Sequence, residues 1–168
     1  MGKMERLLST AALATGMIVA SAVDSAAQKR VVMETDADEV VTLWDNTTAK
    51  HSNYETQDEV FDGKRVKNTS SADLYIFKAP EDKATGYGIV LVPGGSYRNV
   101  SFSTAYAEWL RDNGVTAAIL KYRLPNYGHK EASYEDAAGA VKYLRENADR
   151  LNVDVRKIGI SGSSAGGH

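Results

Sequence analysis

The sequence contains no cysteine among its 168 residues. Disulfide bonds, thiolate metal sites, a cysteine nucleophile and lipidation of a cysteine are therefore all excluded. An excess of basic residues is missing as well, because 20 Lys and Arg stand against 22 Asp and Glu and give a net charge of −2. The sequence thus lacks the electrostatic footprint of a protein that binds nucleic acid, and we expect no nucleic-acid partner.

Metal-binding and nucleotide-binding motifs are missing too. The three histidines, His51, His129 and His168, are scattered and show no metal-ligand spacing. Neither G-x-G-x-x-G nor G-x-x-x-x-G-K-[ST] occurs, and these are the templates of dinucleotide and phosphate binding. We therefore expect neither a metal nor a cofactor.

Residues 1–27 have the pattern of a secretory signal peptide. Lys3 and Arg6 precede an apolar run at 7–20, and small residues with A-x-A-like cleavage sites follow at 20–22 and 25–27. The alternative is an uncleaved anchor, but the apolar run is shorter than the roughly 20 residues that span a bilayer. We expect a secreted or periplasmic protein that has no membrane association after cleavage.

The remaining chain divides into a polar N-terminal arm at 28–70 and a domain at 71–168. The arm has little sustained periodicity apart from an apolar island at 40–44. We expect one or two short strands there, packed through Leu43 and Trp44.

The domain alternates between strand and helix patterns. Continuous apolar runs such as residues 88–92 are typical of strands that are buried on both faces of a sheet. The expected elements in chain order are strands at 74–78 and 88–92, a helix at 104–113, a strand at 115–124, a helix from 133, and a strand at 157–161. This order predicts an α/β fold, with a mostly parallel sheet and helices on both faces.

The two expected helices carry finer predictions. In the first, Tyr106, Trp109 and Leu110 share one face, which we expect to be buried. In the second, Ser133 and Asp136 fit an acidic variant of a capping box, followed by an apolar stripe of Ala137, Ala140, Val141 and Leu144. Glu135, Asp136 and Asp149 are expected to be solvated or to cap.

The last expected strand runs into Gly162-Ser163-Ser164-Ala165-Gly166, which matches G-x-S-x-G. In a nucleophile elbow of this form the central serine sits on a strained turn with its hydroxyl exposed, and the acid and histidine follow it in the sequence. Ser164 is therefore the candidate nucleophile, and a glycine-rich surface turn is the alternative. His51 and His129 precede the serine, and His168 lies one turn beyond it, so chain order favours structural or solvated roles for all three.

A second glycine-rich segment, Pro93-Gly94-Gly95-Ser96-Tyr97, follows the strand at 88–92. Acyl transfer needs preorganised N–H groups to stabilise an oxyanion. One such donor follows the nucleophile, here Ala165, and another comes from the loop after an earlier strand. Gly95 and Ser96 are the candidates for that second donor, and a simple strand-ending turn is the alternative.

These segments together resemble a family of secreted bacterial α/β-hydrolases that includes acetyl xylan esterases and feruloyl esterase-like enzymes. The resembling stretches are residues 43–44 (LW), 93–97 (PGGSY), 120–125 (LKYRLP), 136–137 (DA) and 158–168 (IGISGSSAGGH). Family members often carry a third glycine where this chain has Ser96. The resemblance implies the N-terminal half of an α/β-hydrolase and a serine carboxylesterase that removes acyl groups, chiefly acetyl, from plant polysaccharide such as xylan.

The resemblance also implies that the acid and the histidine lie in a further stretch, so the 168 residues alone are expected to be an inactive, truncated fragment. A prolyl oligopeptidase-like serine peptidase is one alternative, although its usual aromatic residue beside the serine is replaced here by Ser163. A non-catalytic carbohydrate-binding remnant is another. The sequence indicates neither the acyl group nor the oligomeric state.

Overall fold

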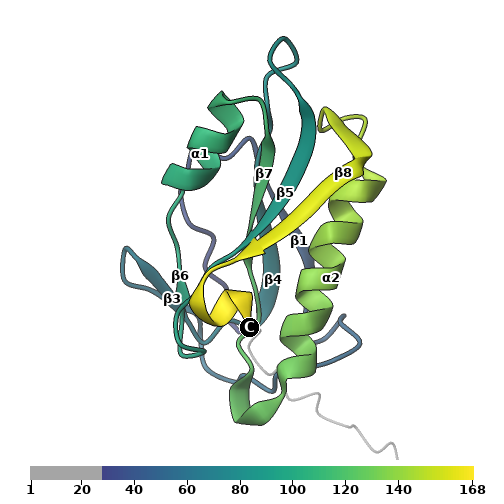
Figure 1. The fold of residues 1–168 in the computed structure, drawn as a ribbon. Helices are drawn as coiled ribbons and strands as arrows, with labels where there is room; N and C mark the ends of the chain where they lie inside the picture. The colour runs from purple at the N-terminus through teal and green to yellow at the C-terminus, as the bar shows by residue number, and fades with distance from the viewer. Residues whose placement is uncertain (1–27) are drawn as a thin grey trace, which may run out of the picture.

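The computed structural model describes residues 28–168, and the predicted signal peptide lies outside them. A five-stranded sheet in the order β1-β4-β7-β5-β8 forms the centre of the described chain (Figure 1). Its strands are β1 (Glu39–Asp45), β4 (Ser71–Phe77), β5 (Gly86–Val92), β7 (Thr116–Lys121) and β8 (Val153–Gly162). A smaller sheet consists of β2 (Val60–Phe61), β3 (Arg65–Lys67) and β6 (Val100–Ser101), in the order β2-β3-β6.

The main sheet is mixed. Strand β5 lies between β7 and β8 and runs parallel to both, as the alternation after residue 88 predicts. Strands β1 and β4 add two antiparallel pairings on the other side of β7. The parallel half therefore carries the ends of β5 and β8, from which the two glycine-rich segments emerge.

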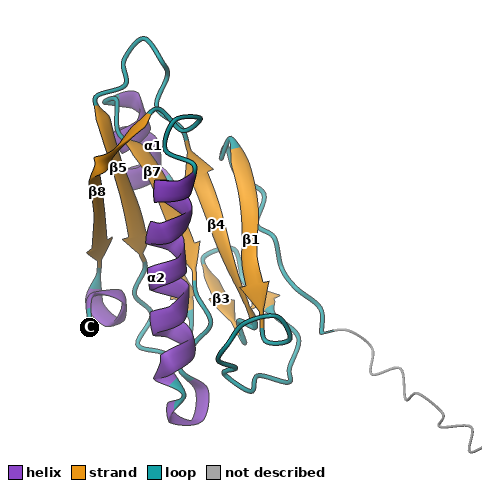
Figure 2. Cartoon of the chain, turned by 90° about the vertical axis from the view of Figure 1, so that its right-hand side faces the viewer, coloured by secondary structure: helices purple, strands orange, loops and turns teal. Residues whose placement is uncertain are grey.

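Helix α1 (Ala105–Asp112) and helix α2 (Lys130–Glu146) cover opposite faces of the main sheet (Figure 2). The expectation of helices on both faces is thus confirmed. Two short 3₁₀ helices, η1 (Asn126–Gly128) and η2 (Ser164–Gly167), complete the elements. No helix in residues 28–168 is long and apolar enough to cross a membrane.

Each helix packs on a separate hydrophobic cluster at one face of the sheet. Ala140 and Leu144 of α2 are fully buried in the larger cluster, with Ala137 and Val141 packed against it, which confirms the predicted stripe. On the other face, Ala107 and Leu110 of α1 are buried with aromatic residues of β4.

The expected buried face of α1 is wrong for two of its three residues. Leu110 is buried, but Tyr106 and Trp109 are 55% and 58% exposed and stack on one another with their ring centroids 6.0 Å apart. The small residue Ala107, three positions before Leu110, takes the inward position instead. The short helix therefore packs closely through a narrow stripe and leaves its large aromatic residues outside.

The predicted capping role of Asp136 is also wrong, because α2 begins at Lys130 and Asp136 is fully buried. Its carboxylate accepts hydrogen bonds from the Arg123 backbone N–H at 2.7 Å and from Arg123 Nη2 at 2.6 Å. The Trp44 indole N–H donates to the same carboxylate. A charged group at this depth needs such partners, since burial of an unpaired charge is costly.

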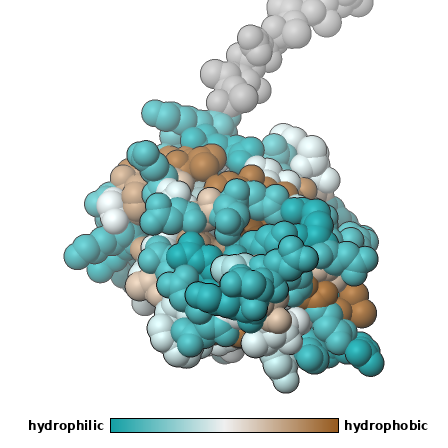
Figure 3. Space-filling model, turned by 90° about the horizontal axis from the view of Figure 1, so that it is seen from above, coloured by the Kyte–Doolittle hydropathy of each residue, from teal (hydrophilic) through white to brown (hydrophobic). Residues whose placement is uncertain are grey.

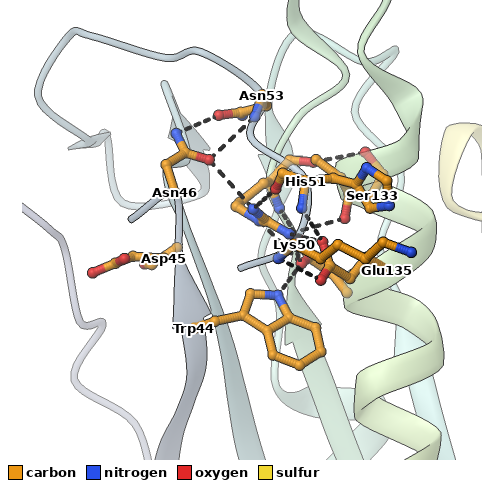
Figure 4. A network of polar contacts seen from close by, with 12 residues as sticks. Trp44, Asp45, Asn46, Lys50, His51, Asn53, Ser133 and Glu135 are labelled. Carbon is orange, nitrogen blue, oxygen red and sulfur yellow. Dashed lines mark hydrogen bonds and ion pairs between the residues drawn. The ribbon is translucent and has the colours of Figure 1, made fainter. Parts of the chain in front are cut away.

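The neighbouring Glu135 joins the loop after β1 to α2 (Figure 4). Its two carboxylate oxygens accept the backbone N–H groups of Lys50 and His51, each at 2.9 Å. Figure 4 shows the Trp44 indole pointing from β1 towards this helix. Trp44, Lys50 and His51 are thereby fixed to α2 by polar contacts, and Trp44 by apolar packing as well.

A second buried ionic cluster fixes the start of the described chain. Lys121 on β7 is fully buried and lies 2.6 Å from both Glu59 and Asp73. Arg30 forms an ion pair with Asp73 at 2.8 Å. Residues 28–70 thus contribute a strand to the main sheet and a counter-ion to its interior.

The parallel strands point towards one end of the molecule, where η2 and the end of the chain lie (Figure 1). The opposite end is seen in Figure 3, where hydrophilic residues predominate. The two glycine-rich segments therefore lie at the carboxyl ends of β5 and β8, where ligands bind in open α/β sheets.

Candidate active site

Ser164 is the first residue of η2, in the tight turn that follows β8. Its φ is 50°, in the left-handed region that side chains with a β-carbon rarely adopt, and the residue is exposed. This is the strained strand-to-helix geometry that G-x-S-x-G predicts. The structure therefore places the candidate nucleophile at the surface, at the carboxyl end of a strand of the parallel half.

The flanking glycines are required by close backbone contacts. A β-carbon on Gly162 would lie 2.1 Å from the Gly166 carbonyl oxygen, and one on Gly166 would lie 2.2 Å from the Val92 carbonyl oxygen. Both obstacles are backbone atoms, which cannot rotate away as a side chain can. The turn after β8 therefore packs directly against the end of β5.

The loop after β5 is tied to this turn. The Gly94 backbone N–H donates to Ser163 Oγ at 3.2 Å, and the Ser163 backbone N–H donates to the Val92 carbonyl oxygen at 3.1 Å. Gly95 has φ 146°, and a β-carbon there would lie 1.9 Å from the Asn99 carbonyl oxygen. Ser96 follows with φ 55°, also in the left-handed region that favours glycine.

The two loops form one cleft of about 370 Å³. Its lining residues are Arg65, Gly94, Gly95, Ser96, Asn99, Ser101, Ser163 and Ser164. Within residues 28–168, the backbone N–H groups of Gly95, Ser96 and Ala165 donate to no protein acceptor. Ser164 and two of the three candidate oxyanion donors thus share a cleft, with unused donors available to a ligand.

Ala165, the third candidate donor, follows Ser164 within η2 and lines a second, larger cavity of about 720 Å³. Apolar side chains line much of this cavity, including those of Val92, Tyr122 and Ile160. The Ser164 turn therefore separates a polar cleft from an apolar cavity.

Tyr122 is hydrogen-bonded to the loop after β5. Its hydroxyl donates to the Pro93 carbonyl oxygen at 3.0 Å, and the side chain is almost completely buried. Burial raises the pKa of Tyr122 to about 12, with a smaller contribution from the nearby Tyr97. The phenol therefore stays protonated as a donor over the neutral pH range.

None of the histidines is placed as a base for Ser164 in the part of the chain that the structure describes. The His168 imidazole forms a hydrogen bond with the Tyr97 hydroxyl through Nδ1, and the two rings meet edge to face at 5.9 Å. Ser164 Oγ has no hydrogen-bond partner among residues 28–168. No group of three His, Asp or Glu side chains in those residues could hold a metal ion.

Sequence reasoning missed several residues of the cleft. Arg65, Asn99 and Ser101 line it, and Ser163 accepts the hydrogen bond that joins the two loops. Ser163 lies within the G-x-S-x-G motif, but the motif assigns it no role. Arg65 gave no local signal, because it comes from a strand of the second sheet, far from the motif in sequence.

The family model of BD-FAE matches residues 73–168, which run from within β4 to beyond the end of η2. The chain belongs to the BD-FAE family. An acetylxylan esterase of Xylanibacter ruminicola is 32% identical over 90 residues, which are 52% of this chain and 18% of that protein. Residues 73–168, which the family model matches, include both glycine-rich loops.

Solved structures show the same fold. An acetyl ester-xyloside bifunctional hydrolase of Caldicellulosiruptor lactoaceticus superposes with a TM-score of 0.58 at 28% identity, over 86% of this chain and 46% of that one. Esterase 2 of Thermogutta terrifontis, in its apo form, gives 0.57 at 25% identity, over 81% and 45%. This BD-FAE chain has an α/β-hydrolase fold and spans less than half the length of these relatives.

Proposed function

We propose that the chain is the nucleophile-bearing part of a secreted serine carboxylesterase that removes acyl groups, chiefly acetyl, from plant polysaccharide such as xylan. One observation carries the proposal. Ser164, exposed at φ 50°, shares a cleft with the unused N–H groups of Gly95 and Ser96.

In the proposed reaction Ser164 Oγ attacks the ester carbonyl carbon while a histidine takes its proton. The carbonyl oxygen becomes an oxyanion and accepts hydrogen bonds from the N–H groups of Ala165 and of Gly95 or Ser96. Each such donor is worth about 3–4 kcal/mol of transition-state stabilisation. The sugar leaves with the proton that the histidine returns, and water then hydrolyses the acyl-enzyme by the same steps.

The acid and the base of this scheme belong to sequence beyond the region matched here. In α/β-hydrolases they follow the nucleophile in the chain, and the present chain covers 46% of the bifunctional hydrolase. The 168 residues alone are therefore proposed to be inactive. Serine hydrolases that lose their triad retain only about 10³–10⁴-fold acceleration over water.

Substrate and location are supported by different observations. The matched relatives are named an acetylxylan esterase and an acetyl ester-xyloside hydrolase. The signal-like pattern of residues 1–27 supports export, which brings an enzyme to polysaccharide that cannot enter a cell.

The proposal is tested with the full-length protein, by following hydrolysis of 4-nitrophenyl acetate and release of acetate from acetylated xylan. Ser164→Ala is expected to lower kcat by a factor on the order of 10⁶. Ser161→Ala, at an exposed serine on the preceding strand β8, is the matched control and is expected to retain activity. Equal activity of Ser164→Ala and wild type would refute the role of Ser164, and cleavage of prolyl anilides without ester cleavage would favour a peptidase.

A covalent probe gives an independent test. Esterase 2 of T. terrifontis has been solved phosphorylated by paraoxon, with a TM-score of 0.55 and 26% identity to this chain. Paraoxon is expected to add one diethylphosphoryl group to the full-length protein, at Ser164 by peptide mapping. Labelling of a different residue, or equal labelling of Ser164→Ala, would contradict the assignment.

A further inference from the structure

Arg65 lies on the exposed face of the small sheet. Strand β3 alternates, with Val66 fully buried while Arg65 and Lys67 are exposed. In the antiparallel pairing with β6, Ser101 lies directly opposite Arg65. Opposed residues project to the same face with their β-carbons about 5 Å apart, so Arg65 and Ser101 form one polar pair.

This polar pair is fixed relative to the loop after β5. The Ser101 backbone N–H donates to the Gly94 carbonyl oxygen at 2.8 Å, which attaches β6 to the loop after β5. Arg65 and Ser101 therefore line the same cleft as Ser164. The register of a short strand pair thus places Arg65 in the cleft that Ser164 lines.

The charge of Arg65 is available to a ligand. Arg65 is the one charged residue that lines the cleft, and its guanidinium has no ion pair or side-chain hydrogen bond within residues 28–168. The nearby Asp62 carboxylate instead accepts the backbone N–H groups of Lys64 and Arg65, at 3.0 and 2.8 Å. These two bonds are the main cause that lowers the pKa of Asp62, and the Arg65 charge contributes less.

The lining of the cleft indicates which part of the substrate it receives. No apolar side chain lines it, whereas Val92, Tyr122 and Ile160 line the cavity on the other side of the Ser164 turn. A hydroxyl-rich sugar suits the first surface, and the methyl group of an acetyl ester suits the second. A planar guanidinium matches a carboxylate in a two-point hydrogen-bonded pair.

We propose that Arg65 is a specificity residue that binds a carboxylate on the sugar of the substrate, so that the enzyme prefers acetyl esters of uronate-bearing saccharides over neutral ones. The inference rests on the proposed esterase function and adds a substrate class to it. Asn99 and Ser101, which line the same cleft, supply further polar groups for the sugar hydroxyls.

The test compares two substrates that differ in one group, an acetyl ester of methyl glucuronide and the corresponding ester of methyl glucoside. The measured quantity is the ratio of their kcat/KM values in the full-length protein. Arg65→Gln is expected to lower the ratio of uronate to neutral ester roughly tenfold, which is about 1.4 kcal/mol. Arg65→Lys keeps the positive charge but lacks the planar guanidinium that binds a carboxylate through two hydrogen bonds, so an intermediate ratio is expected.

Lys67→Gln is the matched control. It removes the same charge from the same face of β3 at a residue that does not line the cleft, so the ratio is expected to stay at the wild-type value. Salt gives a second readout, because raising NaCl from 0.15 to 1 M shortens the Debye length from about 8 to about 3 Å. The wild-type ratio is expected to fall towards that of Arg65→Gln.

Three results would overturn the inference. The first is an unchanged ratio in Arg65→Gln while hydrolysis still depends on Ser164, which leaves the esterase proposal intact. The second is an equal fall in Lys67→Gln. The third is a preference for mono-4-nitrophenyl succinate over 4-nitrophenyl butyrate that depends on Arg65, together with no preference for the glucuronide ester. Arg65 would then bind a carboxylate on the acyl group and not on the sugar. Failure of the esterase proposal is distinguished by Ser164-independent hydrolysis of 4-nitrophenyl acetate.

Discussion

The indole ring of Trp44 on β1 lies directly against Gly139 on α2, where a β-carbon would come within 2.2 Å of the Cη2 atom of the ring. The same indole donates its N–H to Asp136, one turn earlier on the helix. One side chain thus joins an N-terminal edge strand to the long helix by close packing and by a hydrogen bond. These two contacts are expected to reduce local opening of β1, because segments with few buried contacts open at a low cost in free energy.

Gly139→Ala is expected to destabilise the protein in spite of the higher helix propensity of alanine. The added methyl group overpacks the contact with Trp44, which costs about 1–3 kcal/mol, and helix propensity returns at most about 1 kcal/mol. The free energy of unfolding in urea measures the difference. Trp44→Leu supplies the matched background, since it removes the ring and should make Gly139→Ala neutral or stabilising. Equal destabilisation in both backgrounds would contradict the contact as the cause.

Asp136→Asn is expected to lower the free energy of unfolding by up to about 3–5 kcal/mol, because it removes the buried counter-ion of Arg123. The guanidinium then keeps only the partly exposed carboxylate of Glu135 as a counter-ion, at 3.2 Å. Both side chains of the Arg123–Asp136 ion pair are fully buried. Asp149→Asn, at an exposed position of the same acidic type, serves as the control and should stay within about 0.5 kcal/mol of wild type. A loss in Asp136→Asn as small as that of the control would show that solvent reaches Arg123.

Local pattern was sufficient to predict the parallel half of the fold and the two glycine-rich loops. The apolar runs of β5, β7 and β8 and the strained turn at Ser164 depend on neighbours in the sequence, so the sequence carries a direct signal for them. The glycines of the turn are required by backbone contacts between residues of the two loops themselves.

Long-range partners were not predictable in this way. Ser133 and Asp136 have the spacing of a capping box, yet the carboxylate is used by Trp44, 92 residues earlier in the chain. Arg65 likewise reaches the cleft only through the pairing of β3 with β6. In both cases the contact depends on how distant strands pair in the assembled sheet. Local periodicity in the sequence does not indicate that pairing.

Gly166→Ala is expected to lower kcat by roughly a hundredfold, the scale of loss that a 1 Å displacement of a catalytic group can produce. The new β-carbon would lie 2.2 Å from the Val92 carbonyl oxygen, so the Ser164 turn must move away from the loop after β5. Gly159→Ala on β8 is the control, because nothing lies within 4 Å of its β-carbon position. Steady-state hydrolysis of 4-nitrophenyl acetate by the full-length protein measures both, and equal loss in the two variants would argue against displacement of the turn.

Tyr122→Phe is expected to make the protein less sensitive to alkaline pH. Burial raises the pKa of Tyr122 to about 12 in the folded state, against about 10 in an unfolded chain. A folded pKa above the unfolded one means that the stabilisation is fully present below about pH 10 and is lost as the pH rises towards 12. Burial also raises the pKa of Tyr75 to about 12, so the wild type loses stability over this window through at least these two phenols.

The free energy of unfolding in urea, measured at pH 8, 10, 11 and 12, separates the contribution of Tyr122. Tyr122→Phe loses the hydrogen bond to the Pro93 carbonyl oxygen and should be less stable than wild type at pH 8, but its stability should fall less steeply above pH 10. Tyr134→Phe, at a side chain that is 54% exposed, should retain the wild-type slope. If the free energies of unfolding of Tyr122→Phe and wild type fall in parallel from pH 10 to 12, ionisation of Tyr122 does not destabilise the fold. That result would contradict the raised pKa that burial gives this phenol.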